Sequence, residues 1–432
     1  MIRPGLRAAL PCLLGLAAQA QAPLLQDGAA ALRQARLDWT LGQAPLEPSS
    51  LPSFEVGWGG ADSGGAYVPL VGGEGLGHGT RGWGLGIQGR YTTGGWGFAA
   101  TVLGLRDQGR TTGVLQRALV GFQFNSGGRI TLEQSPLGWG SGLNGGPLLG
   151  DAARPFPRVT LAFAPLELFR SVWRLEAFEG RLERTPAVPE WSLDRPARLA
   201  AQAAGLGLER PTLGGGLLQV SFGMDLEVSL GTLKLSGGQD AGGQTAPQQS
   251  NLIQSLAELR LRLPALAHLV GARGASVTAS RVGARSGGPP SLVPARDSGG
   301  LQLVWDRWDL GLEVAGAAPR ATFSAPPPTY LAGFSTRGDA LGAAFGDATT
   351  TRTLALGLPL FLEGRGRLQV VRATAHQDDP SGPGGWFLQG DAQWRTPTGR
   401  LGASVGSRRN ELPGAPPRWG WSCSLFQAFR VF

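Results

Sequence analysis

The sequence predicts an all-β fold: a transmembrane antiparallel up-and-down β-barrel of about 18 strands, with a short N-terminal periplasmic helix. Three observations predict this fold. Only 16% of the 432 residues are charged, well below the roughly 25% that is usual in soluble domains. Apolar and polar residues alternate over stretches of ten or more positions. The connections between the expected strands are short at one end of the barrel and long at the other.

Residues 1–20 have the pattern of a secretory signal peptide. Arg3 and Arg7 form the basic region, residues 8–18 form an apolar stretch, and cleavage is expected after Ala20. After this leader, no run reaches the roughly 18 apolar residues that a membrane-spanning helix requires. A helical inner-membrane protein is therefore excluded.

Residues 21–63 are expected to form a periplasmic N-terminal segment. Within it, 28–41 has apolar residues at helical spacing. From about residue 64 the period changes from that of a helix to that of a strand. The barrel is accordingly expected to span 64–432.

The alternation is clearest in 354–362, where every second residue is leucine. Thr353, Ala355 and Gly357 occupy the opposite face of this predicted strand. Similar alternation is found in 83–90, 218–230 and 386–395. Strands of a soluble sandwich also alternate, but they are usually five or six residues long. Because roughly nine to eleven residues span a bilayer as a strand, the lengths favour the barrel.

The expected strands follow one another along the chain. They span about 64–71, 79–91, 95–106, 114–125, 129–135, 156–164, 170–182, 198–209, 216–232, 254–263, 270–284, 299–306, 309–316, 352–362, 367–376, 386–395, 400–409 and 419–431. With both termini in the periplasm, short turns are expected on the periplasmic side at 92–94, 126–128, 363–366 and 396–399. Long connections are expected on the outer side at 136–155, 183–197, 237–253, 285–298 and 317–351. This asymmetry is typical of outer-membrane barrels.

Motifs for catalysis and for metal or nucleotide binding are weak. Lys234 is followed by Leu235, which rules out a phosphate-binding P-loop. His78, His268 and His376 are isolated in sequence, so no pair has metal-ligand spacing. A net charge of +8 without a clustered basic stripe does not indicate nucleic-acid binding. No enzyme and no cofactor are therefore expected, although a triad assembled from distant residues stays open.

The most specific motifs lie between residues 138 and 182. They are Gly138-Trp139-Gly140-Ser141-Gly142, Pro147-Leu148-Leu149, Ala152-Ala153-Arg154-Pro155-Phe156-Pro157-Arg158-Val159, Trp173 and Phe178-Glu179-Gly180-Arg181-Leu182. Over about residues 120–210 the chain resembles the capsule assembly Wzi family of outer-membrane proteins. Ser141 departs from the family pattern, which has proline at this position.

The resemblance implies a monomeric barrel of the outer membrane that acts as a lectin for capsular or other surface polysaccharide and helps attach or assemble it. Its expected partners are this polysaccharide, outer-membrane lipid and the barrel assembly machinery, the last also indicated by the final Phe432. The glycan-binding candidates lie in or beside the expected outer loops and comprise Trp139, Arg154, Arg158, Trp191, Asp194 and Arg195.

Aromatic faces suit sugar rings, and the arginine fork suits the carboxylates of an acidic glycan. A structural role is the alternative for each candidate: Trp139 packing a loop inside the lumen, for example, or Arg154 pairing with a lumen carboxylate. The alternative function is a porin or substrate-specific channel, which a folded-in loop with opposed acidic and basic lumen rows would favour. An outer-membrane hydrolase is a third alternative.

Overall fold

The fold is seen in a computed structural model. The residues it describes are 40, 53–63, 82–93, 96–107, 110–124, 127–134, 137–144, 147–149, 156–182, 211–236, 252–286, 288–293, 295–316, 335–336, 339–340, 349–361, 364–375, 384–396, 399–410 and 418–430. The expected signal peptide and the expected helix at 28–41 lie outside these residues, apart from Thr40.

Nearly all described elements are strands. They are β1 Ser53–Ser63, β2 Gly82–Thr93, β3 Trp96–Asp107, β4 Arg110–Gln123, β5 Arg129–Gln134, β6 Arg158–Ala162, β7 Leu166–Leu168, β8 Ser171–Arg181, β9 Thr212–Phe222, β10 Leu226–Ser236, β11 Leu252–Arg262, β12 Gly274–Ser286, β13 Ala295–Val304, β14 Asp309–Ala315, β15 Ser335–Thr336, β16 Asp339–Ala340, β17 Thr349–Pro359, β18 Arg365–Ala375, β19 Gly385–Thr396, β20 Gly399–Asn410 and β21 Arg418–Arg430. One helix, α4 Pro264–Leu269, lies between β11 and β12. No helix among the described residues is long and apolar enough to cross a membrane.

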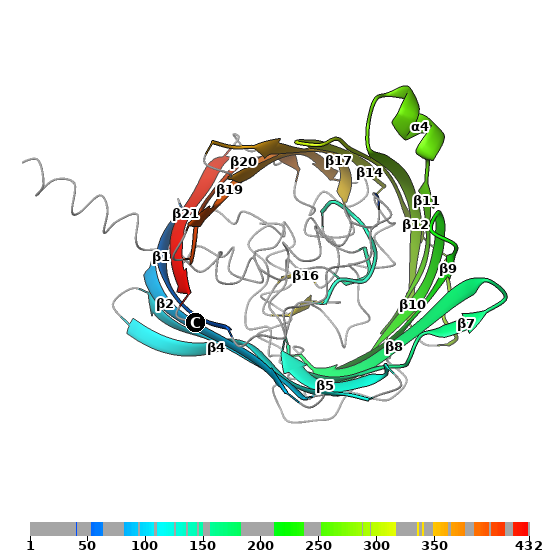
Figure 1. The fold of residues 1–432 in the computed structure, drawn as a ribbon, viewed down its shortest axis with the longest axis horizontal. Coiled ribbons are helices and arrows are strands. Elements are labelled where there is room, and N and C mark those ends of the chain that lie inside the picture. The colour runs from blue at the N-terminus through cyan, green and yellow to red at the C-terminus, as the bar shows by residue number, and fades with distance from the viewer. Residues whose placement is uncertain are drawn as a thin grey trace, which may run out of the picture.

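The main sheet is a closed antiparallel barrel (Figure 1). It contains 19 strands, but β6 and β7 both pair with the single strand β8 and follow each other along it. They occupy one strand position, so the barrel has 18 positions in its circumference. The last strand β21 pairs antiparallel with the first strand β1. An up-and-down barrel can close with an antiparallel pair only when its number of strands is even. The expected number of strands is confirmed.

The two ends of the barrel differ as predicted. One end carries both barrel termini and the turns at 94–95, 223–225, 305–308, 360–364 and 397–398; it is called the short-turn end. The opposite, long-loop end carries the connections 135–157, 182–211, 237–251 and 316–348, together with the two-residue turn 108–109. Outer-membrane barrels have the same asymmetry, with short turns on the periplasmic side and longer loops on the outer side.

Two strand positions differ from the sequence prediction. The first strand of the barrel, β1, starts at Ser53 within the expected N-terminal segment, and the strand expected at 64–71 lies outside the described residues. The stretch 216–232, expected as one strand, is a hairpin of β9 and β10 around Gly223, and the expected strand at 198–209 lies outside the described residues. Both differences have physical causes. Three of the eleven residues of β1 are glycine, which hides its alternation. A three-residue turn pairs Phe222 with Leu226, so the alternation continues through the turn without changing phase.

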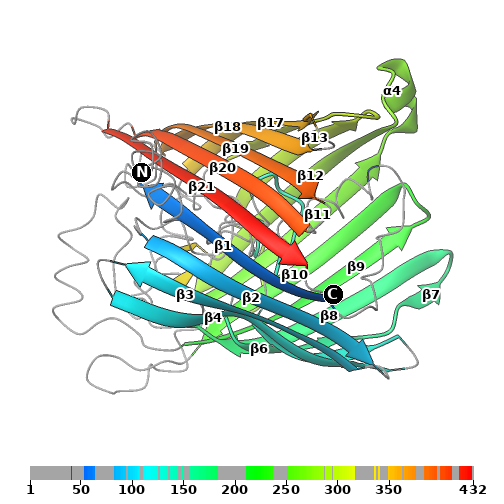
Figure 2. The ribbon, with the colours of Figure 1, turned by 60° about the vertical axis from the view of Figure 1, so that its left-hand side comes forward.

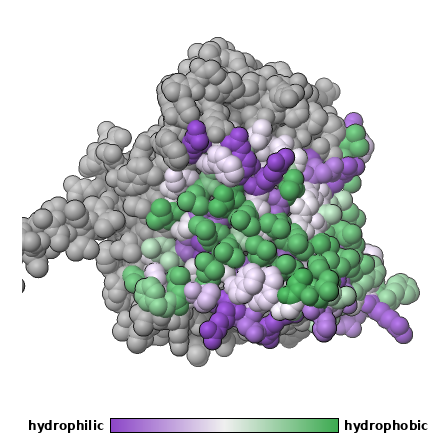
Figure 3. Space-filling model, turned by 90° about the horizontal axis from the view of Figure 1, so that it is seen from above, coloured by the Kyte–Doolittle hydropathy of each residue, from purple (hydrophilic) through white to green (hydrophobic). Residues whose placement is uncertain are grey.

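The outward face of the barrel is apolar. Exposed positions include Leu354, Leu368, Leu388 and Val405, which alternate with inward Thr353 and similar small or polar residues. Figure 3 shows hydrophobic side chains gathered in a band with hydrophilic side chains along both edges. Near the short-turn end, aromatic rings pack on one another in the pairs Trp96–Phe98, Phe122–Phe124, Trp305–Trp308 and Phe361–Trp394. Such aromatic girdles are typical of the bilayer interface.

Candidate functional site

The connection between β5 and β6 folds into the lumen, where Figure 1 shows it inside the ring of strands. Its described residues 137–144 and 147–149 are called the inserted loop. Its ends are joined by a bridge in which the Trp139 N–H donates to the Leu149 carbonyl at 2.9 Å. Gly140 has φ of 101° and lies against Pro147, so a side chain at this position would be both strained and obstructed. The expected outer connection 136–155 is therefore partly a lumen element.

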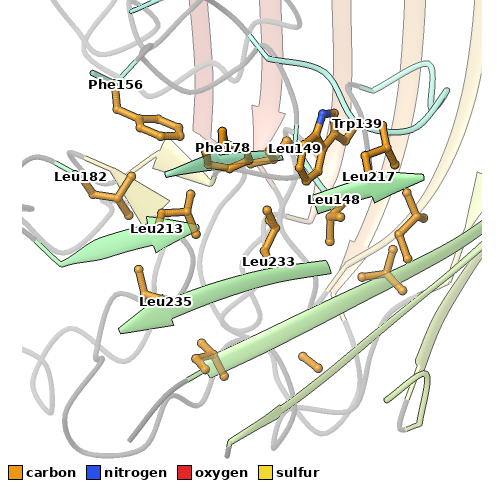
Figure 4. Close-up of a cluster of buried hydrophobic side chains, with 14 residues drawn as sticks. Trp139, Leu148, Leu149, Phe156, Phe178, Leu182, Leu213, Leu217, Leu233 and Leu235 are labelled. Atoms are coloured by element: carbon orange, nitrogen blue, oxygen red, sulfur yellow. The ribbon is translucent and has the colours of Figure 1, made fainter. Parts of the chain in front are cut away.

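One half of the inserted loop packs on an apolar part of the inner wall. Figure 4 shows its side chains facing those of the strands. The cluster consists of Trp139, Leu148, Leu149, Phe156, Phe178, Leu182, Leu213, Leu217, Leu233, Leu235, Leu252, Leu256, Val282 and Ala284. The strand residues come from β8 to β12 and lie toward the long-loop end. An inward apolar surface of this size is unusual for a hydrated lumen, and the inserted loop accounts for it by covering it.

Glycines of the inner wall make room for the inserted loop. A Cβ at Gly215 of β9 would lie 2.9 Å from the Trp139 ring, and one at Gly231 of β10 would lie 3.0 Å from Leu148. At Gly311 of β14, the three heavy atoms nearest to such a Cβ all belong to Leu143, at 3.0 to 3.6 Å. Each glycine thus allows close contact between one apolar side chain of the loop and the strand backbone.

The Trp139 side chain is 2% exposed. Its ring packs edge-on against Phe178 with 5.0 Å between centroids, and its Nε1–H donates to Glu176 Oε1 at 3.3 Å. Burial of the ring with its polar atom satisfied is the usual condition for a buried tryptophan. The structural alternative for Trp139, packing a loop inside the lumen, is what the structure shows.

Two buried glutamates of the wall, Glu258 on β11 and Glu313 on β14, hold the inserted loop by its backbone. The N–H of Ser141 donates to Glu258 Oε2 at 2.9 Å, and the N–H of Leu143 donates to Glu313 Oε2. Both glutamates are at most 7% exposed. Carboxylates that accept backbone N–H groups in a buried setting form strong hydrogen bonds. These two residues are called the wall glutamates.

Asn144 extends this attachment to β17 and β18. Its Nδ2 donates to Glu313 Oε1 at 3.1 Å and to Thr353 Oγ1 at 2.7 Å, and its Oδ1 accepts from Gln369 Nε2 at 2.9 Å. All four side chains are buried. The inserted loop therefore contacts strands from β8 to β18, about half of the circumference.

The lumen wall around the apolar cluster carries paired charges. The Arg158 guanidinium lies 3.3 Å from Glu133, and Arg260 lies 2.9 Å from Glu227. The more exposed Arg129 is 3.4 Å from Glu176, the same carboxylate that accepts from Trp139. Acidic and basic groups thus alternate around β5 to β11.

The N-terminal segment reaches the same wall at the short-turn end. The Thr40 hydroxyl is 2.9 Å from that of Ser276 on β12, and its carbonyl accepts from Arg262 of β11 at 3.3 Å. Thr40 is buried by these contacts. Part of the expected periplasmic segment is therefore attached to the lumen wall.

The structure places the six candidate residues as follows. Trp139 is buried in the inserted loop, and the Arg158 side chain is 1% exposed in its ion pair with Glu133. In this structure neither is available to a sugar ring or an acidic glycan, because each is enclosed by its protein partners. Arg154, Trp191, Asp194 and Arg195 lie outside the described residues.

Sequence reasoning missed the wall glutamates, Asn144 and Gln369. One signal was present: Glu258 lies within 252–262, which is otherwise rich in leucine and isoleucine, at a position that alternation assigns to the lumen. A carboxylate at such a position requires a polar partner inside the barrel. No group of three or more His, Cys, Asp or Glu side chains in the described part of the chain is arranged to hold a metal ion.

Comparisons with known proteins agree with this geometry. No family model and no curated protein matches the sequence. Among solved structures, the chain is similar to Wzi of Escherichia coli, described as an outer membrane protein involved in group 1 capsule assembly and as a carbohydrate-binding β-barrel. The TM-score is 0.63 at 16% identity, covering 98% of each chain.

The chain is also similar to two Pseudomonas aeruginosa proteins. OpdK, an outer membrane protein, has a TM-score of 0.51 at 11% identity, covering 88% of this chain and 99% of that one. OccK2 (OpdF) has a TM-score of 0.50 at 13% identity, covering 88% and 98%. These neighbours are outer-membrane barrels and not enzymes. The chain has the fold of an outer-membrane β-barrel, and the expected resemblance to Wzi is confirmed at the level of that fold.

Proposed function

We propose that this barrel binds capsular or other surface polysaccharide at its long-loop end and helps attach or assemble it at the cell surface, without covalent catalysis. The observation that carries the proposal is the attachment of the inserted loop. Buried hydrogen bonds from Ser141, Leu143 and Asn144 fix the loop to the wall. An inserted loop that is fixed to the lumen wall suits a rigid binding surface better than a path through which solutes pass. The similarity to a carbohydrate-binding barrel over 98% of the chain supports the same function.

The glycan contacts are proposed for Arg154, Trp191, Asp194 and Arg195. They belong to the connections before β6 and after β8, and these two strands pair with Arg158 opposite Gly180. The strand ends to which the two connections are attached therefore lie side by side. Arginine forks bind glycan carboxylates, and a tryptophan face packs on sugar rings.

Trp139 and Arg158 take a different role in this proposal. They are buried at the two ends of the connection that carries Arg154. We propose that they position this connection and do not touch the glycan. Replacing them should lower the stability of the loop together with glycan binding, whereas replacing Arg154 should lower binding alone.

The test is a binding assay on refolded barrel with an acidic capsular polysaccharide and its carboxyl-reduced form. We expect the acidic polymer to bind, the reduced polymer to bind less, and Arg154→Ala/Arg195→Ala to weaken binding of the acidic form. Gln219→Ala, on the inner face of β9, is the matched control. If a panel of polysaccharides shows no binding and a deletion strain keeps its surface layer unchanged, the proposal is wrong.

A channel is the second candidate, and the acidic and basic groups on the lumen wall favour it. Planar-bilayer conductance separates the two candidates. Steady unitary currents from the unmodified protein would support the channel, whereas the polysaccharide-binding function predicts little or no current.

Two further partners belong to the proposal. The C-terminal strand β21 completes the barrel by pairing with β1, so assembly machinery that inserts barrels into the membrane is an expected partner. Because no strand of this closed sheet lacks a neighbour, a second copy is not needed to complete it. We propose that the protein is a monomer, which the mass of the detergent-solubilised protein would test.

A further inference from the structure

A row of basic residues crosses the outward face of four neighbouring strands. Arg352 of β17 pairs with Arg372 of β18, Arg372 with Trp386 of β19, and Trp386 with Arg409 of β20. These four residues, called the basic row, lie at one level of the barrel because each is the direct partner of the next. Arg352 is exposed and Arg372 and Arg409 are partly exposed, while Trp386 is 48% exposed.

The basic row lies at the long-loop edge of the apolar band. The next outward row toward the short-turn end consists of Leu354, Val370, Leu388 and Ser407. Figure 3 shows hydrophilic side chains along such an edge of the hydrophobic band. At this level the hydrocarbon of the bilayer ends and the lipid headgroups begin.

Charge makes this row unusual. Arg352 and Arg372 are direct cross-strand partners, and like charges in this position repel each other. The outward neighbours toward the long-loop end, Thr350 and Thr374, carry no charge. Arg281 of β12 also faces outward at this end, and Asp297 of β13 binds it through two hydrogen bonds of 2.6 and 2.8 Å.

Trp386 packs against one arginine of the basic row. The Arg372 guanidinium lies 5.4 Å from the centroid of the Trp386 ring, a distance typical of a cation–π contact. Tryptophan is favoured at the headgroup level of membranes. The pair therefore holds a positive charge at the depth where lipid phosphates lie.

We propose that the basic row binds the phosphate groups of the glycolipid that forms the outer leaflet of a Gram-negative outer membrane. Guanidinium forks match phosphate oxygens in geometry and charge. Strands are about 4.8 Å apart, so the row extends over roughly 14 Å from β17 to β20. A headgroup with two phosphates spans more of this distance than one with a single phosphate. The adjoining apolar rows contact its acyl chains, which a soluble acidic polysaccharide does not possess.

The test uses the folded barrel in nonionic detergent, with bisphosphorylated lipid A as the probe and native mass spectrometry as the measurement. We expect Arg352→Gln/Arg372→Gln/Arg409→Gln to weaken lipid A binding by on the order of tenfold or more. The control Arg281→Gln/Asp297→Asn removes an outward arginine at the same end without changing net charge, and should leave binding unchanged. Heat-dependent gel migration confirms that each variant is folded.

Three outcomes would overturn the proposal. One is unchanged binding by the folded triple variant, and another is equal binding of dephosphorylated lipid A. The third is a soluble acidic polysaccharide that loses the same affinity in the triple variant, which would assign the row to a glycan. If the triple variant does not fold, Arg352→Gln alone provides the test, because Arg352 is the most exposed arginine of the row. Arg352→Lys keeps the charge and should retain part of the binding.

Discussion

Trp139 illustrates how burial determines a residue's role. An aromatic side chain in a glycine-rich connection suits a sugar-binding surface by its chemistry alone, but this ring is enclosed by Phe178, Gly215 and the cluster around them. The wall glutamates are the converse case. Isolated carboxylates in apolar strands acquire a role only when the backbone N–H groups of the inserted loop reach them.

Glu313→Gln tests the attachment of the loop. Glu313 accepts from the Leu143 backbone with one oxygen and from Asn144 with the other, and an amide can accept with only one. We expect the free energy of unfolding to fall by about 1–3 kcal/mol, measured by urea denaturation in detergent. Hydrogen exchange of the Leu143 amide should become faster. Glu227→Gln is the control, because the Glu227 carboxylate is also buried in the wall but pairs with Arg260. It should leave the hydrogen-exchange rate of the Leu143 amide unchanged.

Gly311 and Leu143 form a second pair to be tested at this scale. Gly311→Val introduces a side chain at a position where Leu143 atoms lie 3.0 Å from the first added carbon. Overpacking of this kind costs roughly 1–3 kcal/mol. In a Leu143→Ala background the cost should fall, and a double-mutant cycle measures the difference. Equal costs in the two backgrounds would show that the glycine does not accommodate the loop.

At the scale of the element, the β9–β10 hairpin shows how strands end. Alternation runs through 218–230 without interruption, and nothing in it marks a turn. Gly223 is the residue that makes the turn, with φ of 60°. The signal was therefore a single glycine in a chain that contains 70.

Gly223→Val should lower the free energy of unfolding by roughly 1–2 kcal/mol, because an L side chain is strained at this φ. Apart from its chain neighbours, nothing lies within 4 Å of a Cβ added at Gly223. The loss of stability therefore comes from backbone strain alone. Gly216→Ala on the same hairpin is the control: it has ordinary backbone angles, and its nearest atom lies 3.9 Å away. A loss in the control as large as that in Gly223→Val would contradict this explanation.

At the scale of the whole molecule, the pairing of β21 with β1 closes the main sheet and leaves it without a free edge (Figure 2). The inserted loop crosses part of the enclosed space. The apolar cluster and the wall glutamates lie on strands between β8 and β14, and both sets contact the inserted loop. The described lumen wall therefore has an apolar part that the loop covers and charged pairs beside it.

Replacing 138–148 by a short Gly-Ser turn tests this organisation. We expect the barrel to fold with reduced stability, because the inward apolar residues of β9 to β11 become exposed to water. Ion conductance in planar bilayers should rise relative to the unmodified protein. Unchanged conductance would mean that the inserted loop does not limit passage through the lumen.

Much of the fold was predictable because alternation is local. Each predicted strand required only its own residues, and the even number and the two unlike ends followed from counting. The predicted number of strands was correct partly because two differences offset each other. The prediction counted 198–209 and 216–232 as one strand each, and the structure has the two strands β9 and β10 within 212–236. The prediction for β1 was wrong because glycines carry no hydropathy.

The sequence by itself determined the closed β-barrel, its outward apolar face and its short-turn and long-loop ends. The tertiary structure decided which residues meet inside and around it. Asn144 and Gln369 are 225 residues apart, and the arginines of the basic row lie on three different strands. The physical reason is that alternation specifies the face to which a side chain points, whereas strand register and loop placement specify its neighbours.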